Sequence, residues 1–297
     1  MTALAAYLDR QRAHVDAALA AAFPVDPDHP HRLLEAVRYS LLDGGKRLRP
    51  ILTIAACEAV GGTLEAALPA ACAVEMIHAY SLIHDDLPAM DDDALRRGRP
   101  TTHVAFDEGL AILAGDALLT EAFAVLTRQA AAAARPRRLV QVAVEIAEAA
   151  GARGMVGGQA ADLAATGTTA DLPTVEFIHV RKTGALLRAS VRSGALLGGA
   201  SRSQLQRLTR YAECLGLAYQ IADDILDAEG ARTATGKVER RDQTLHKATF
   251  PSVLGLPAAK ARVRELHDEA LAALQRFPAR AIPLRDIVGF VVSRATD

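Results

Sequence analysis

Apolar residues recur along most of the chain at the i, i+3, i+4 and i+7 spacing of helices, and prolines and glycines interrupt this pattern. The pattern predicts helices over residues 3–22, 31–42, 50–60, 66–87, 109–133, 137–151, 153–165, 174–199, 203–228, 251–255, 258–276 and 283–294. Residues 91–103 and 229–247 lack the pattern and are polar, so we expect two loops there. Because no change in composition marks a linker, we expect one domain over residues 1–297, built as a large bundle of helices.

The composition agrees with an all-α fold. Hydrophobic residues make up 51% of the 297 residues, but aromatic residues only 4%, and tryptophan is absent. The apolar content is mainly alanine and leucine, which favour helices, rather than the β-branched and aromatic residues that fill strands. A chain of this length can also bury a large core.

Charge and targeting signals exclude several classes of protein. The net charge of −1 creates no general attraction to nucleic acid or to an anionic membrane. No stretch of 18 residues is free of charge, and Asp9 and Arg10 come too early for a signal peptide, so we expect a cytoplasmic protein with no membrane partner. Cys57, Cys72 and Cys214 lack the spacing of metal ligands and are expected to be buried free thiols.

Two acidic clusters end long apolar helices, in the segments SLIHDDLPAMDDD and YQIADDILDAEG. Their members are Asp85, Asp86 and Asp91 in the first cluster and Asp223, Asp224 and Asp227 in the second. Crowded carboxylates repel one another unless a cation lies between them, and Mg²⁺ suits such a site because it bridges carboxylates to substrate phosphates. Solvated surface pairs would explain either cluster alone. Two clusters in matching positions favour metal binding.

Basic residues lie where a polyphosphate would need donors. The segment GGKRLRP supplies Lys46 and Arg49, and the first loop supplies Arg96 and Arg97. Further candidates are Lys182 beside Thr183 in a predicted helix, Lys237 and Lys247 in the second loop, and His78 two helical turns before Asp85. Arg47 and Arg99 are interpreted as solvated surface charges. An unpaired Lys182 in apolar surroundings would be costly, which favours a binding role for it.

The order of these motifs resembles one protein family. GGKRLRP, EMIHAYSLIHDDLPAMDDDALRRGRPT, GGQAADL, KTGALLRA, YQIADDILD and KATFP follow one another between about residues 44 and 251. In this order they resemble the trans-isoprenyl diphosphate synthases, and most of all the bacterial farnesyl diphosphate synthases. The resemblance implies a homodimer of isoprenoid-synthase-type bundles, each around a central cavity. It also implies head-to-tail condensation of isopentenyl diphosphate with dimethylallyl or geranyl diphosphate to give farnesyl diphosphate.

The resemblance also assigns roles to matching residues. It implies three Mg²⁺ ions, two bound by Asp85 and Asp91 and one by Asp223, with support from Asp86, Asp224 and Asp227. It implies that isopentenyl diphosphate is held by Lys46, Arg49, His78 and Arg97, and the allylic diphosphate by Arg96, Lys182, Lys237 and Lys247. Thr183 and Gln220 would aim oxygen dipoles at the allylic carbons. Arg294 matches a basic residue that some members place over the isopentenyl site.

Product length should follow from the depth of the cavity. Tyr80 and Ser81 precede Asp85 by five and four residues, which is about 6–8 Å along a helix. A bulky Tyr80 at that depth can form the floor of the cavity, although ordinary core packing explains it equally well. In the family, an aromatic residue here together with the LPAM spacer suggests the C15 product.

Several alternatives stay open. Within the family, the enzyme could instead stop at geranyl or geranylgeranyl diphosphate. A terpene cyclase shares the fold but does not use isopentenyl diphosphate and has no need of GGKRLRP. A non-catalytic regulatory subunit usually loses one aspartate cluster, whereas both are intact here. An ion-binding scaffold would leave Lys182 and His78 unexplained.

Overall fold

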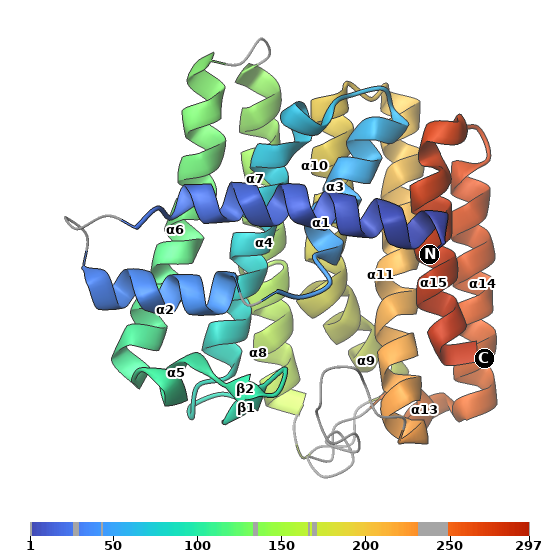
Figure 1. Ribbon diagram of the computed structural model, residues 1–297. Coiled ribbons are helices and arrows are strands. Elements are labelled where there is room, and N and C mark those ends of the chain that lie inside the picture. Colours follow the sequence, from blue (N-terminus) through green and yellow to red (C-terminus); the bar gives the residue numbers. More distant parts are fainter. Residues whose placement is uncertain are drawn as a thin grey trace.

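The protein is a bundle of helices, seen in a computed structural model that describes residues 2–25, 30–42, 44–132, 136–165, 167, 171–230 and 249–296 (Figure 1). The first half contains α1 (Ala3–Ala22), α2 (His31–Leu41), α3 (Leu48–Ala59), α4 (Leu64–Asp85), β1 (Leu95–Arg96), β2 (Arg99–Pro100), α5 (Thr102–Ala105), α6 (Glu108–Ala132) and α7 (Pro136–Ala150). The second half contains α8 (Met155–Ala165), α9 (Leu172–Ile178), η1 (His179–Gly184), α10 (Ala185–Gly198), α11 (Arg202–Glu229), α13 (Phe250–Leu254), α14 (Leu256–Leu274), η2 (Ala279–Ala281) and α15 (Ile282–Thr296). The predicted all-α class is confirmed.

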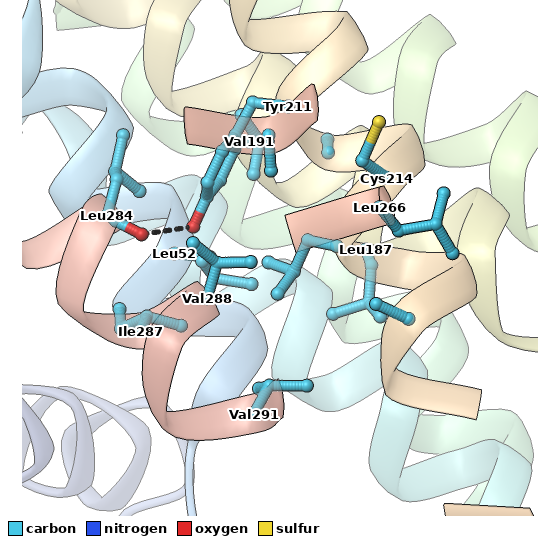
Figure 2. Close-up of a cluster of buried hydrophobic side chains, with 14 of the residues drawn as sticks. Leu52, Leu187, Val191, Tyr211, Cys214, Leu266, Leu284, Ile287, Val288 and Val291 are labelled. Carbon is cyan, nitrogen blue, oxygen red and sulfur yellow. Dashed lines mark hydrogen bonds between the residues drawn. The ribbon is translucent and has the colours of Figure 1, made fainter. Parts of the chain in front are cut away.

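The helices surround two buried hydrophobic clusters. Around the first, α4 packs against α3, α6 and α10, and α1 crosses this group of helices (Figure 1). Around the second, α11 packs against α10, α14 and α15. Figure 2 shows part of the second cluster, where the hydroxyl of the fully buried Tyr211 donates to the carbonyl oxygen of Leu284 at 2.7 Å. This bond satisfies a polar group that would otherwise be costly inside an apolar core.

The first predicted loop contains a small hairpin that the periodicity did not reveal. β1 and β2 pair antiparallel through Arg96 and Arg99, and Arg97 and Gly98 form the connection between them. Both connecting residues have positive φ, 53° and 77°, as the tight turns of two-residue hairpins require. The strands are too short to show alternation, so only the Arg-Gly pair hinted at this turn.

One predicted helix is divided in three. Residues 174–199 were expected to be one helix, but the chain forms α9, the π-helical turn η1 and α10 in succession. A π-turn adds a residue to the helix and rotates the side chains on either side of it relative to each other, and such turns occur often at functional sites. η1 includes Lys182 and Thr183, both of which the sequence singled out.

The C-terminal ends of α4 and α11 lie at the same end of the bundle. In Figure 1 the hairpin that follows α4 and the short α13 that follows α11 are both at the bottom of the view. The fold therefore brings the two aspartate-bearing helix ends to one side of the molecule.

The three cysteines are free and buried, as predicted. Among the described residues, two helices are long and apolar enough to cross a membrane by length and composition alone, Leu64–Asp85 and Glu108–Arg128. The first is 72% buried within the bundle, as a core helix would be, whereas the second is only 33% buried. The second therefore leaves apolar surface uncovered in the single chain.

Candidate active site

A cavity of about 550 Å³ lies between the end of α4, the beginning of α6, α8 and η1. Its polar lining residues are Arg49, His78, Ser81, His84, Asp85, Gln159, Lys182 and Thr183. Its apolar lining includes Tyr80, Leu87, Ile112, Met155, Val156 and Leu163. The cavity thus combines charged groups with an apolar wall, as a site for an amphiphilic anion would.

Asp85 lies in this wall at the last position of α4. Burial raises the pKa of its carboxyl group to about 6, Lys182 opposes this shift, and the nearby Asp91 adds to it. The backbone N–H of Asp91 donates to the carbonyl oxygen of Asp85 at 2.9 Å, so the turn after α4 holds the two residues together. Two of the predicted metal-binding carboxylates are therefore neighbours beside the predicted lysine.

The carboxylate of Asp86 pairs with Arg96, and its predicted support of a metal ion stays a prediction. Its side chain is buried, with 3% of the residue exposed, and the Arg96 guanidinium binds it with N–O distances of 2.6 to 2.9 Å. Arg96, predicted to hold the allylic diphosphate, therefore pairs with a carboxylate predicted to support metal. Asp93, at 3.8 Å, adds to the same cluster. This arrangement anchors the hairpin to the end of α4.

The members of the second acidic cluster, on α11, also have different partners. Burial raises the pKa of Asp223 to about 6 against the opposing charges of Arg294 and Lys46, and Arg294 lies 3.4 Å from its carboxylate. Asp227 and Gln220, one turn to either side of Asp223 on α11, are half-buried. Asp224 accepts hydrogen bonds from His179 and from the backbone of Phe250, and its predicted metal support stays a prediction.

The four residues predicted to hold isopentenyl diphosphate form an electropositive group. Burial, together with the charges of neighbouring arginines, lowers the pKa of His78 well below its usual value. Burial likewise lowers the pKa of Lys46, of Arg49 and of Arg97. The Arg49 Nε is buried with no hydrogen-bond partner. Lys46, Arg49 and Arg97 are cations partly withdrawn from water, so a bound diphosphate would offset the cost of their burial and make this group a candidate anion site.

The loop that carries Lys46 and leads into α3, where Arg49 lies, is held by Arg47, which was wrongly interpreted as a surface charge. Arg47 is 4% exposed and donates to Asp16 at 2.8 Å, Glu75 at 2.8 Å and the carbonyl oxygen of Leu41 at 2.7 Å. These three acceptors lie on α1, α4 and α2, so a single guanidinium ties three helices to the loop. Arg99, by contrast, is exposed as predicted, and its guanidinium lies 4.3 Å from the ring centre of Tyr39.

Lys182 reaches the cavity because α8 and η1 pack without side chains between them. A Cβ atom at Gly158 would lie 2.2 Å from the backbone nitrogen of Lys182, so only glycine permits this approach. The same packing brings Asp162, one turn further along α8, to 2.7 Å from the Lys182 ammonium. Thr183 is 9% exposed and lines the cavity beside Lys182.

We expect Gly158→Ala to disable the site while leaving the fold largely intact. The methyl group must push η1 away from α8, an overpacking cost of about 1–3 kcal/mol in the free energy of unfolding. Because Lys182 and Thr183 move with η1, activity should fall by roughly 100-fold. The control is Gly289→Ala on α15, where nothing lies within 4 Å of the added methyl group. Activity of Gly158→Ala equal to that of the control would refute the close-packing argument.

The carboxylates suit a metal ion whose coordination sphere is completed by a bound ligand. Among the described residues, no three His, Cys, Asp or Glu side chains converge closely enough to hold a metal ion alone. Asp85 and Asp223 nevertheless carry raised pKa values, so an added cation would stabilise both in their ionised forms. These carboxylates supply only part of a metal ion's coordination sphere. Such a site fits Mg²⁺, which keeps bound waters and takes substrate phosphates as further ligands.

Three contacts of the site were missed by sequence reasoning. Asp162 lies in the segment GGQAADL, where a lone carboxylate in an apolar helix was the available signal. His179 contacts Asp224, and Glu75 contacts Arg47. Each partner lies far away in the sequence, so no local pattern reveals these contacts. Lys237 and Lys247 lie outside the described residues, and their predicted role stays a prediction.

The fold and this site together define a class: an all-helical protein with a cavity that combines a carboxylate, basic groups and an apolar wall. The family model for polyprenyl synthetase matches residues 30–280. The chain therefore belongs to the polyprenyl synthetase family, the trans-isoprenyl diphosphate synthases, and is a prenyltransferase.

Individual relatives agree with this assignment. A dimethylallyltranstransferase of Fischerella ambigua is 46% identical over 97% of this chain and 83% of its own length. A chloroplastic geranylgeranyl pyrophosphate synthase of Capsicum annuum is 49% identical over 89% of this chain and 72% of its own length. The crystal structure of an FPP/GFPP synthase from Zymomonas mobilis is 42% identical with a TM-score of 0.88, covering 97% of this chain and 98% of that one.

Proposed function

We propose that this prenyltransferase condenses isopentenyl diphosphate with dimethylallyl and geranyl diphosphates to give farnesyl diphosphate. The observation that carries the proposal is that two sets of charged residues line one cavity. Arg49 and His78 belong to the electropositive group predicted to hold isopentenyl diphosphate. Asp85 and Lys182, predicted to bind metal and the allylic diphosphate, line the same cavity. Two diphosphates can therefore be held apart while their hydrocarbon ends meet in one apolar space.

The proposed reaction needs charge stabilisation rather than a protein nucleophile. The carbon–oxygen bond of the allylic diphosphate breaks, and both of its electrons leave with the diphosphate. The alkene of isopentenyl diphosphate then donates its π electrons to the allylic cation, which forms the new carbon–carbon bond and a tertiary cation. The released diphosphate takes the proton that this cation loses, and the electrons of that carbon–hydrogen bond form the double bond of the product. Lys182, oriented by Asp162, stabilises the leaving charge, and the oxygen of Thr183 faces the cation. The apolar wall excludes water that would trap the cation.

Magnesium is part of the proposal. Asp85 and Asp91 would hold ions on the α4 side and Asp223 on the α11 side, and family members generally depend on Mg²⁺. When bound, the metal neutralises charge on the diphosphate oxygens and so makes the diphosphate a better leaving group. Arg294, which pairs with Asp223 in the structure, would move toward the isopentenyl diphosphate as the metal takes its place.

A geranylgeranyl product is the second candidate, because several relatives bear that name, among them the Capsicum annuum protein. Farnesyl diphosphate is favoured by Tyr80, which is 7% exposed and contributes its ring to the cavity wall. Incubation of the purified protein with Mg²⁺, isopentenyl diphosphate and dimethylallyl diphosphate, followed by chromatographic sizing of the products, tests both. A dominant C15 product supports the proposal, a C20 product supports the second candidate, and no prenyl product overturns both.

We further propose that two copies of the chain associate through α6 and α7. Ile112 and Leu113 on α6 are 45% and 53% exposed, and Val140 and Val144 on α7 are 61% and 52% exposed. The two helices are neighbours, so these residues leave apolar surface of a kind that a second copy covers. The resemblance to a dimeric family favours this occupant over a lipid surface.

Leu113→Glu is expected to convert the dimer to a monomer, because it would bury two unpaired carboxylates at the interface. Light scattering coupled to size exclusion should give twice 31.4 kDa for the wild type and 31.4 kDa for the variant. The matched control is Val253→Glu, at an exposed site on α13. A monomeric wild type, or one that binds lipid vesicles instead of itself, would overturn the proposal.

A further inference from the structure

The carboxylate of Asp224 joins three separate segments. Its Oδ2 accepts a hydrogen bond from Nε2 of His179 at 2.9 Å and another from the backbone N–H of Phe250, also at 2.9 Å. The His179 ring stacks on the Phe250 ring, with ring centres 5.5 Å apart and planes inclined by 14°. All three residues are more than nine-tenths buried, with exposed fractions of 6%, 8% and 1%.

Two of these segments carry predicted substrate-binding and metal-binding groups. His179 is the first residue of η1 and lies one turn before Lys182 and Thr183. Asp224 directly follows Asp223 on α11. The third segment, α13, begins at Phe250, whose N–H is one of the donors that a helix start leaves without an internal partner.

The position of Asp224 argues against a role as metal ligand. Consecutive residues of a helix point about 100° apart, so Asp224 does not share the face of Asp223. Its Oδ2 is already engaged by two donors inside the core. Removal of the carboxylate would leave the His179 and Phe250 donors buried and unpaired, and would also remove a polar link between η1 and α11.

We propose that Asp224 and His179 are a positioning pair that sets the distance between η1 and α11, and with it the placement of Lys182 and Thr183 relative to Asp223. The inference rests on the proposed function, because the purpose of the pair is to place the groups that hold the allylic diphosphate accurately. The pair touches neither substrate nor metal. It acts through the backbone of the π-turn.

The experiment compares truncating with conservative variants. Asp224→Ala and His179→Ala should each lower kcat/KM for the allylic diphosphate by about tenfold to 100-fold, while KM for isopentenyl diphosphate changes by less than about twofold. The double variant should be no worse than either single one, because both remove the same link. Asp224→Asn keeps an acceptor oxygen and His179→Gln keeps a donor, so both should recover to within about fivefold of wild type.

A metal ligand would behave differently. Its loss raises the Mg²⁺ concentration needed for half-maximal activity, and asparagine would be nearly as harmful as alanine. That result for Asp224, or wild-type kinetics for His179→Ala, would overturn the positioning role. Calorimetric binding of inorganic pyrophosphate in the presence of Mg²⁺ gives a second readout for the same variants. If the wild type forms no prenyl product, the proposed function fails, and the pyrophosphate affinities still decide whether the pair positions an anion site.

Discussion

Asp85→Asn is expected to remove nearly all turnover and, in the absence of metal, to make the protein more stable at neutral pH. Turnover should fall by roughly 1,000-fold, because metal-assisted charge stabilisation contributes several kcal/mol to such reactions. Asparagine has nearly the shape of aspartate but lacks its charge. Asp223→Asn should lose activity similarly, with a smaller gain in stability because the substitution also breaks the pair with Arg294.

The stability change has a defined dependence on pH. The folded protein raises the pKa of Asp85 from 3.8 to about 6, so the folded state binds a proton more tightly than the unfolded chain does. The stability gained in this way is fully present below pH 3.8 and is lost as the pH rises through about 6. At pH 7.5 the wild type therefore bears the whole cost of a buried charge, which the neutral asparagine of the variant avoids.

Thermal unfolding in EDTA at pH 4.5 and 7.5 measures this difference. We expect the Asp85→Asn variant to gain in melting temperature mainly at the higher pH, and Mg²⁺ with pyrophosphate to stabilise the wild type more than this variant. Asp268→Asn, whose side chain is 82% exposed on α14, is the control for a carboxylate outside the site. Near wild-type turnover of Asp85→Asn in the presence of Mg²⁺ would contradict the proposal that this carboxylate binds the metal ion.

The helical periodicity was a good guide to the fold because the elements are long. α1 matches its predicted bounds, and α6 and α11 differ from theirs by one residue at each end. The π-turn η1 escaped prediction because an inserted residue hardly alters an apolar pattern. The close approach of Gly158 to this turn is likewise a tertiary contact that no local pattern reveals.

For the site, the sequence predicted which chemical groups gather but not which of them pair. Clusters of like charge indicated an anion and a metal, and the structure brings Asp85 to Lys182 and Arg49 to His78. Adjacent aspartates looked equivalent in the sequence. Because neighbouring side chains at a helix end point in different directions, Asp86 and Asp224 instead bind Arg96 and His179. Such partners come from distant segments, so only the folded chain identifies them.

Tyr80→Ala is expected to lengthen the product from C15 toward C20 and beyond. Tyr80 is buried in α4, and its ring lies edge-on to His84 with centres 5.8 Å apart. It lines the cavity on the same helix as Asp85 and five residues before it, so truncation deepens the apolar space without touching the charged groups. The loss of a buried ring should also lower the free energy of unfolding by about 3–5 kcal/mol.

A matched control separates product length from general damage. Phe277→Ala removes a ring of equal burial, 6% exposed, from the other hydrophobic cluster and should lose comparable stability with no change in product. Ser81→Phe adds bulk to the same wall and should favour C10 or slow the second condensation. Product sizes from all three variants and the wild type, measured under one substrate ratio, give the answer. If folded and active Tyr80→Ala makes the wild-type product, the ring only packs the core, and the length of the product must be set by other residues of the cavity wall.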